Sequence, residues 1–170
     1  MAIRVQGTLL GGLFNADPHP GNYFFGEQGR VAFLDFGCVQ EVAAEQCALG
    51  IRTHRAACLK DVPAFEAAAA EMMHLRGGAY QQQALAYLRE AFRPQLEAPF
   101  RITPAYVAGL VAMFKDAFQS ARQSADDEYV PFESGIFFLN RLQFGFYSVL
   151  ARLDVAVDYA GVEMEFLAGR

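Results

Sequence analysis

The chain has 170 residues, of which 54% are apolar and 14% aromatic, and its formal net charge is -5 at pH 7. An apolar content this high excludes extended disorder and is sufficient for one sizeable core, so we expect a single domain. The acidic balance, with no cluster of Lys and Arg, excludes a groove that binds nucleic-acid phosphates.

The first expected element is a helix that ends at two glycines. Residues Ile3–Gly11 have the pattern of a helix end, and Gly11 and Gly12 stop the helix. A short extended pair, Leu13 and Phe14, then leads the chain into a polar loop.

The polar loop has the sequence N-A-D-P-H-P-G-N and runs from Asn15 to Asn22. Pro18 and Pro20 lock the φ angle, so the loop has few conformations and holds Asp17 and Asn22 at a set separation. We therefore expect a preorganised set of polar side chains.

A β-hairpin is expected after this loop, and it ends at a second motif, D-F-G. Its two apolar strands and its turn are Tyr23–Phe25, Val31–Leu34 and Gly26–Gly29. Strand pairing returns Asp35 to the neighbourhood of Asn22. An amide oxygen and a carboxylate placed together suit Mg²⁺, which keeps several waters and also binds substrate phosphates. Asp17 then remains available to accept a proton from an attacking hydroxyl.

The order A-D-P-H-P-G-N, then L-D-F-G, resembles the catalytic and metal-binding loops of the protein-kinase fold. The fuller string is similar to the UbiB/AarF/ADCK family of atypical kinases, and the segment R-L-Q-F-G-F-Y-S-V-L-A-R-L from Arg141 resembles that family's C-terminal helix. The resemblance implies that Asp17 is catalytic and that Asn22 and Asp35 bind Mg²⁺ and, with it, ATP. His19 stands where many kinases place a lysine, so it contacts either a phosphate or the loop itself.

Two departures from the family pattern affect what the resemblance implies. Asn15 replaces the usual His two residues before the aspartate, although an amide can hydrogen-bond the same backbone. No glycine-rich nucleotide loop, and no strand lysine with its helix glutamate partner, can lie in the few residues before Asn15. Residues 1–170 are therefore expected to be the C-terminal lobe alone, with the N-terminal nucleotide-binding lobe absent or supplied by a partner or an upstream segment.

The rest of the chain predicts a helical bundle. Apolar periodicity indicates helices at Ala43–Cys58, Pro63–Arg76, Ala79–Phe92, Pro104–Ala121, Phe132–Leu153 and Asp154–Leu167. A connector is expected at Gln95–Arg101 and a polar loop at Gln123–Glu128. No long activation segment follows Gly37, which argues against a protein substrate. The expected fold class is mainly α (α+β): a kinase-like C-lobe helical bundle with one small β-hairpin that carries the catalytic and metal-binding loops.

The cysteines and the apolar segments indicate the compartment. Cys38, Cys47 and Cys58 lack metal-ligand spacing and leave an odd count, which argues against a disulfide framework and favours the cytoplasm. His54 and Cys58, at i, i+4 spacing, are interpreted as a packed helix face. No apolar window is long enough to span a membrane. A lobe without its partner lobe should nevertheless expose apolar surface, so we expect a second protein or a peripheral contact with membranes or isoprenoid lipids.

The leading hypothesis for function is a UbiB-type atypical kinase or ATPase C-lobe that uses Mg²⁺ and ATP in ubiquinone or isoprenoid-lipid metabolism. One alternative is a small-molecule phosphotransferase of the aminoglycoside or choline kinase type, whose loops also resemble these motifs. The other is a non-catalytic fragment that binds a nucleotide or a partner.

Overall fold

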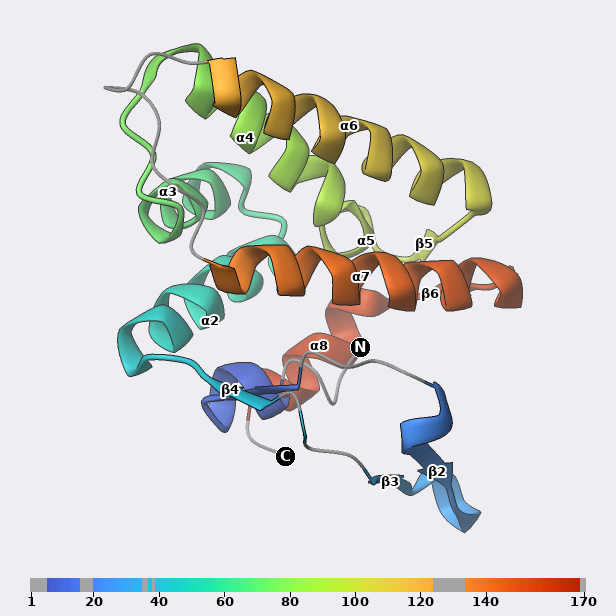
Figure 1. The fold of residues 1–170 in the computed structure, drawn as a ribbon. Helices are drawn as coiled ribbons and strands as arrows, with labels where there is room; N and C mark the ends of the chain where they lie inside the picture. The colour runs from blue at the N-terminus through green and yellow to red at the C-terminus, as the bar shows by residue number, and fades with distance from the viewer. Residues whose placement is uncertain (1–5, 16–19, 35–36, 38, 124–133, 169–170) are drawn as a thin grey trace.

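The computed structural model describes residues 6–15, 20–34, 37, 39–123 and 134–168. The chain is mainly helical, as expected, and a bundle of helices lies beside a smaller unit of short strands (Figure 1). The α-helices are α2 Ala44–Cys58, α3 Val62–Met72, α4 Gly78–Ala91, α5 Arg93–Leu96, α6 Pro104–Gln123, α7 Ser134–Leu153 and α8 Tyr159–Leu167. The short helical turns are η1 Gln6–Leu10, η2 Pro20–Asn22 and η3 Glu27–Gly29.

The strands among the described residues form three antiparallel pairs. They are β1 Leu13–Asn15, β2 Tyr23–Phe25, β3 Val31–Phe33, β4 Val39–Glu41, β5 Phe100–Arg101 and β6 Ala156–Val157. β1 pairs with β4, β2 with β3 and β5 with β6. Only the β2–β3 pair was expected from the sequence.

Local signals explain where several helices begin. The carboxylate of Asp61 accepts a hydrogen bond from the amide of Ala64 at 3.1 Å and caps α3. Thr103 Oγ1 accepts from the amide of Tyr106 at 3.1 Å, beside the proline that opens α6. Asp158 caps α8 by accepting from the amide of Gly161 at 2.9 Å. Each cap satisfies an amide that the first turn leaves without a helical partner.

The structure corrects three expected boundaries. The Gln95–Arg101 connector is not irregular throughout, because its ends belong to α5 and β5. The expected Asp154–Leu167 helix is divided: Asp154 has a left-handed φ of 48°, β6 follows it, and α8 begins at Tyr159. The helix expected over Pro63–Arg76 ends already at Met72.

The main core lies where α2, α3, α4, α6 and α7 meet. Phe65 and Leu110 are fully buried in it, and Tyr147 is nearly so. The Tyr147 hydroxyl donates to the carbonyl of Ala91 at 3.1 Å and so ties α7 to α4. The described end of α7 also has exposed residues such as Val149, so part of this helix faces solvent.

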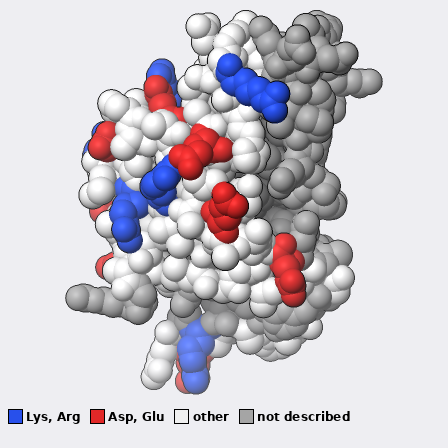
Figure 2. Space-filling model, turned by 90° about the vertical axis from the view of Figure 1, so that its left-hand side faces the viewer, with Lys and Arg blue, Asp and Glu red and all other residues white. Residues whose placement is uncertain are grey.

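Ion pairs on the surface join neighbouring helices. Arg52 of α2 pairs with Glu71 of α3, and Arg89 of α4 pairs with Glu66 of α3. On the face drawn in Figure 2, acidic and basic side chains are interspersed and form no patch of a single sign. No helix among the described residues is long and apolar enough to cross a bilayer.

Candidate functional site

The predicted motifs lie within two nested β ladders. In the inner ladder, β2 pairs with β3 in the register Tyr23 to Phe33, which confirms the expected hairpin. In the outer ladder, β1 pairs with β4 and places Asn15 opposite Val39. Both predicted motifs therefore fall, in sequence, between the paired residues of the outer ladder. We call residues 13–41 the motif unit.

The hairpin turn follows from its sequence. The amide of Gly26 donates to the carbonyl of Arg30 at 2.8 Å and closes the turn. Gln28 has a φ of 61°, in the left-handed region that a tight turn requires. The expected turn at Gly26–Gly29 is thus present, with η3 inside it.

One hydrogen bond continues the inner ladder toward the motifs. The amide of Leu34 donates to the carbonyl of Asn22 at 3.0 Å. Leu34 immediately precedes the D-F-G sequence, so the end of β3 lies beside the residue that ends the polar loop. The side chain of Asn22 is half-buried within η2.

Asn22 is the one predicted site residue that the structure describes. Asp17, His19 and Asp35 lie outside the described residues, so their predicted roles stay predictions. Among the described residues, no group of three or more His, Cys, Asp or Glu side chains is arranged to hold a metal ion. Asp17, His19 and Asp35 all lie outside that part of the chain, so this finding does not test their site.

The outer ladder joins the helical body at its base. The amide of Val42 donates to the carbonyl of Gly12 at 2.9 Å, one step beyond the β1–β4 register. Gly12 has a φ of 64°, which a residue with a Cβ adopts only with strain. This glycine lets the chain turn from η1 into β1.

Apolar side chains on and next to the motif unit are exposed. Phe25, at the end of β2, is 77% exposed. The other large exposed apolar residues of this region are Leu10, Leu13, Phe24, Leu34 and Val39. Such a concentration is typical of a surface that another molecule covers.

A buried polar cluster lies among the helices, and sequence reasoning missed it. His54 of α2 was interpreted as part of a packed face, but its Nδ1 pairs with the carboxylate of Glu163 on α8. Glu163 is 1% exposed, and its other carboxylate oxygen accepts from Gln95 Nε2 at 2.8 Å. The available signal was an acidic residue at an apolar position of the helix, since Tyr159, Ala160, Glu163 and Leu167 share the buried face of α8.

Cys58 lies near this cluster, and its thiol is expected to be unreactive. Burial, and secondarily the carboxylates of Glu163 and Asp158, raise the pKa of its thiol from 9.0 to about 12. The thiolate is the reactive form, so Cys58 has neither the nucleophilicity nor the ligand character of an active cysteine.

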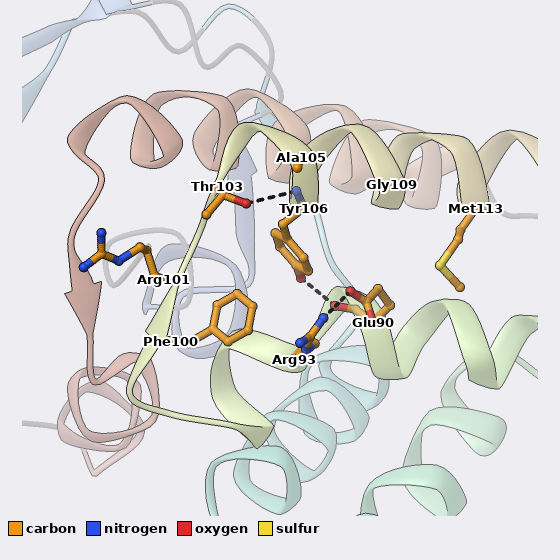
Figure 3. A pocket seen from close by; sticks show the side chains of 9 residues that line it. All are labelled: Glu90, Arg93, Phe100, Arg101, Thr103, Ala105, Tyr106, Gly109 and Met113. Atoms are coloured by element: carbon orange, nitrogen blue, oxygen red, sulfur yellow. Dashed lines mark hydrogen bonds and ion pairs between the residues drawn. The ribbon is translucent and has the colours of Figure 1, made fainter.

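A cavity of about 580 Å³ lies between α4, α5, β5 and α6 (Figure 3). Arg93 crosses it above the ring of Phe100, 5.1 Å from the ring centroid, and pairs with Glu90 and Glu97. The Tyr106 hydroxyl donates to the carbonyl of Glu90 at 2.5 Å, and burial raises the pKa of Tyr106 well above its usual value. Each charged group that lines the cavity is paired, Glu90 with Arg93 and Arg101 with Asp154. No described residue of the motif unit lines the cavity.

Comparisons with known proteins agree with the position of the motifs. Residues 1–67 match the ABC1 atypical kinase-like domain, a range that contains the whole motif unit and α2. A stretch of 39 residues is 61% identical to the chloroplastic protein ACTIVITY OF BC1 COMPLEX KINASE 1 of Arabidopsis thaliana, covering 23% of this chain and 6% of that protein. A stretch of 34 residues is 53% identical to ACTIVITY OF BC1 COMPLEX KINASE 3 of the same plant, covering 20% of this chain and 5% of that protein.

These matches support an atypical kinase family of the ABC1 kind for the N-terminal part of the chain. The matched stretches span only a small fraction of each relative's length.

Proposed function

We propose that the motif unit is the catalytic and metal-binding part of an ABC1-type atypical kinase or ATPase that uses Mg²⁺ and ATP. The observation that carries this proposal is the bond from the Leu34 amide to the Asn22 carbonyl at 3.0 Å. It brings the residue that precedes D-F-G beside the residue that ends D-P-H-P-G-N, within the range that matches the kinase-like domain.

The donor set fits the proposed ion. Asn22 offers an amide oxygen and Asp35 a carboxylate, and Mg²⁺ prefers such hard oxygen ligands in small number beside substrate phosphates. If held by Asn22 and Asp35, Mg²⁺ would offset the negative charge of the substrate phosphates. Asp17 is proposed to orient the attacking hydroxyl or water and to accept its proton. His19 contacts a phosphate in this scheme, or else hydrogen-bonds within the loop.

Residues 1–170 act, in this proposal, as the C-terminal lobe of a two-lobed enzyme. Phosphoryl transfer requires cationic groups and backbone amides on both sides of the phosphates, in addition to the metal. We therefore propose that an upstream segment or a partner chain supplies the nucleotide-binding lobe. The exposed Phe24, Phe25 and Leu34 of the motif unit support this view, since a covering lobe would bury them.

A finer assignment follows from the sequence resemblance to the UbiB/AarF/ADCK family. We propose a role in ubiquinone or other isoprenoid-lipid metabolism, in the cytoplasm and at the periphery of a membrane. The match to the ABC1 domain favours this over an aminoglycoside- or choline-kinase type of phosphotransferase. A non-catalytic partner-binding module is the second candidate, because the same exposed apolar side chains suit a protein contact without catalysis.

The roles of the motif residues are separable by experiment. In a protein that includes the nucleotide-binding lobe, Asn22→Ala and Asp35→Asn should weaken Mg²⁺-dependent ATP binding, because ligands act in the ground state. Asp17→Asn should leave binding nearly intact and lower turnover by about 10²- to 10⁴-fold, the usual contribution of a general base. Glu45→Gln, which alters an exposed carboxylate on α2, is the control. Equal losses of ATP affinity in all three motif variants would refute this division of roles.

In this proposal, residues 1–170 by themselves should bind Mg²⁺-ATP only weakly, because tight binding needs phosphate-holding groups from both lobes. Calorimetry on residues 1–170 tests this, and a submicromolar dissociation constant would contradict it.

The covering partner is tested separately. Phe24→Ser together with Phe25→Ser should abolish association with a separately expressed nucleotide-binding lobe in sedimentation experiments. Flotation with neutral and anionic vesicles tests whether the chain binds membranes. Anionic lipid should repel a chain of net charge -5, so any binding should be stronger to neutral vesicles. A wild-type chain that binds neither the lobe nor vesicles would show that the exposed surface is not a docking site.

A further inference from the structure

The motif unit is joined to the helical body through a narrow base at α2. Cys47, in the first part of α2, is 8% exposed, and its Sγ lies 3.4 Å from the carbonyl oxygen of Thr8 in η1. The same Sγ lies 3.7 Å from the carbonyl oxygen of Val42, directly after β4. One side chain therefore contacts the chain just before β1 and just after β4.

The chemistry of a thiol suits this position. A thiol has one S–H donor, so Cys47 donates to one of the two carbonyls at a time, or shares its proton between them. Sulfur's long bonds and large radius let the same atom reach both oxygens. A serine hydroxyl in this place would retain the donor but would lie farther from the two oxygens.

A second contact on the same helix supports the base. Gly50 lies one turn after Cys47, and a Cβ added there would be 2.6 Å from Cδ2 of Leu9. A side chain at this position would require the end of the Leu9 side chain to shift, so Gly50 lets Leu9 of η1 pack directly against α2. Cys47 and Gly50 thus both contact η1, the segment that leads into β1.

The printed contacts of the strands differ between the base and the hairpin of the motif unit. β1 packs on η1, and η1 packs on α2 and α8, whereas β2 and β3 pack mainly on each other. In Figure 1 the β2–β3 hairpin extends away from the helical bundle. Among the described contacts, those at the base are thus the main ones that connect the motif unit to the helices.

We propose that Cys47 is a positioning residue that sets the orientation of the motif unit on the helical body. This inference rests on the proposed function in one respect: the residues it positions are the proposed metal and nucleotide groups. The geometric part stands on the contacts of Cys47 alone.

Cys58 provides a matched control. It lies on the same helix, is also 8% exposed, and packs on Ala98, Ala160 and Met164, away from the motif unit. Truncation of either cysteine to alanine removes one buried sulfur from α2. If Cys47→Ala and Cys58→Ala affect the motif unit differently, the difference is due to the position of the lost thiol, because both variants lose a buried sulfur from the same helix.

Hydrogen exchange resolved by residue tests the geometric part on the whole chain. Cys47→Ala should speed exchange of the Val42 amide and of the β1 and β4 amides by about tenfold, the signature of local opening. Cys47→Ser should restore much of the protection, and Cys58→Ala should leave these amides unchanged. Gly50→Ala disturbs the same region by displacing the side chain of Leu9, so it should also speed hydrogen exchange of these amides. This variant tests the proposal if Cys47→Ala does not fold.

Binding of Mn²⁺ alone, measured by electron paramagnetic resonance, tests the functional part. Cys47→Ala should lower Mn²⁺ affinity by about fivefold, below the roughly 10- to 100-fold effect of groups that hold metal ligands directly. Cys58→Ala should not change it at equal thermal stability. If Asp35→Asn leaves Mn²⁺ binding unchanged, the proposed metal site is wrong, and exchange alone then decides the role of Cys47. Equal exchange and equal affinity in Cys47→Ala and Cys58→Ala would overturn the proposal.

Discussion

Replacement of Glu163 by alanine is expected to destabilise the fold strongly, although this residue lies far from the motif unit in sequence. Glu163 pairs with His54 across 109 residues of chain and also accepts from Gln95. The carboxylate thereby joins α8 to α2 and to α5. Its removal takes away the shared acceptor of two side chains and leaves a small cavity.

The size of the effect follows from burial. Loss of an acceptor that leaves a buried donor unsatisfied costs about 1–3 kcal/mol, and truncation of a buried side chain to alanine adds the cost of a cavity. The side chain of His54 is 22% exposed and can regain water, so its share lies at the low end. We expect Glu163→Ala to lower the free energy of unfolding by about 3 kcal/mol, or the melting temperature by about 6–12 °C for a chain of this length.

Thermal and urea unfolding followed by circular dichroism measure this effect. Glu165→Ala, which removes an exposed carboxylate from the same helix, is the control and should change the unfolding free energy by less than about 0.5 kcal/mol. Glu163→Gln keeps the volume and one acceptor oxygen, so its loss should be intermediate. A loss for Glu163→Ala within the range of the control would refute the assignment of Glu163 as the link between these helices.

Two further predictions concern single side chains. The Cys58 thiol, with its pKa raised from 9.0 to about 12, should react with iodoacetamide at pH 8 about 1,000-fold more slowly in the folded chain than in urea, as followed by mass spectrometry. The thiol ionises at lower pH in the unfolded chain, so the free energy of unfolding should fall as pH rises from about 9 toward 12. Cys58→Ala should reduce this dependence on pH. If Cys58 in the folded chain reacts with iodoacetamide as fast as in urea, both the slow reaction and the pH dependence are contradicted. Asp61→Ala removes the cap of α3 and should cost about 1 kcal/mol in urea unfolding, whereas Asp61→Asn, which keeps a capping oxygen, should cost less; equal losses would show that the cap bond does not matter.

The sequence by itself determined the local elements of this protein. The inner hairpin was predicted at Tyr23–Phe25 and Val31–Leu34 because apolar runs around a glycine-bounded turn have few other folded arrangements. The start of α6 was predicted from Thr103 and the proline that follows it, since the capping bond joins residues within one turn. The motifs predicted the match to an ABC1 kinase-like domain, because they are contiguous strings of side chains.

Tertiary structure alone decided which distant segments meet. Nothing within Leu13–Asn15 or Val39–Glu41 specifies the other as its partner, so the outer ladder was not predicted. The same holds for β5 and β6, which joined an expected connector to an expected helix. The burial of Glu163 against His54 depends on how α8 packs on α2. Such contacts form only when separate elements bury their apolar faces against one another. They therefore depend on the packing of the whole core and cannot be read from neighbouring residues in the sequence.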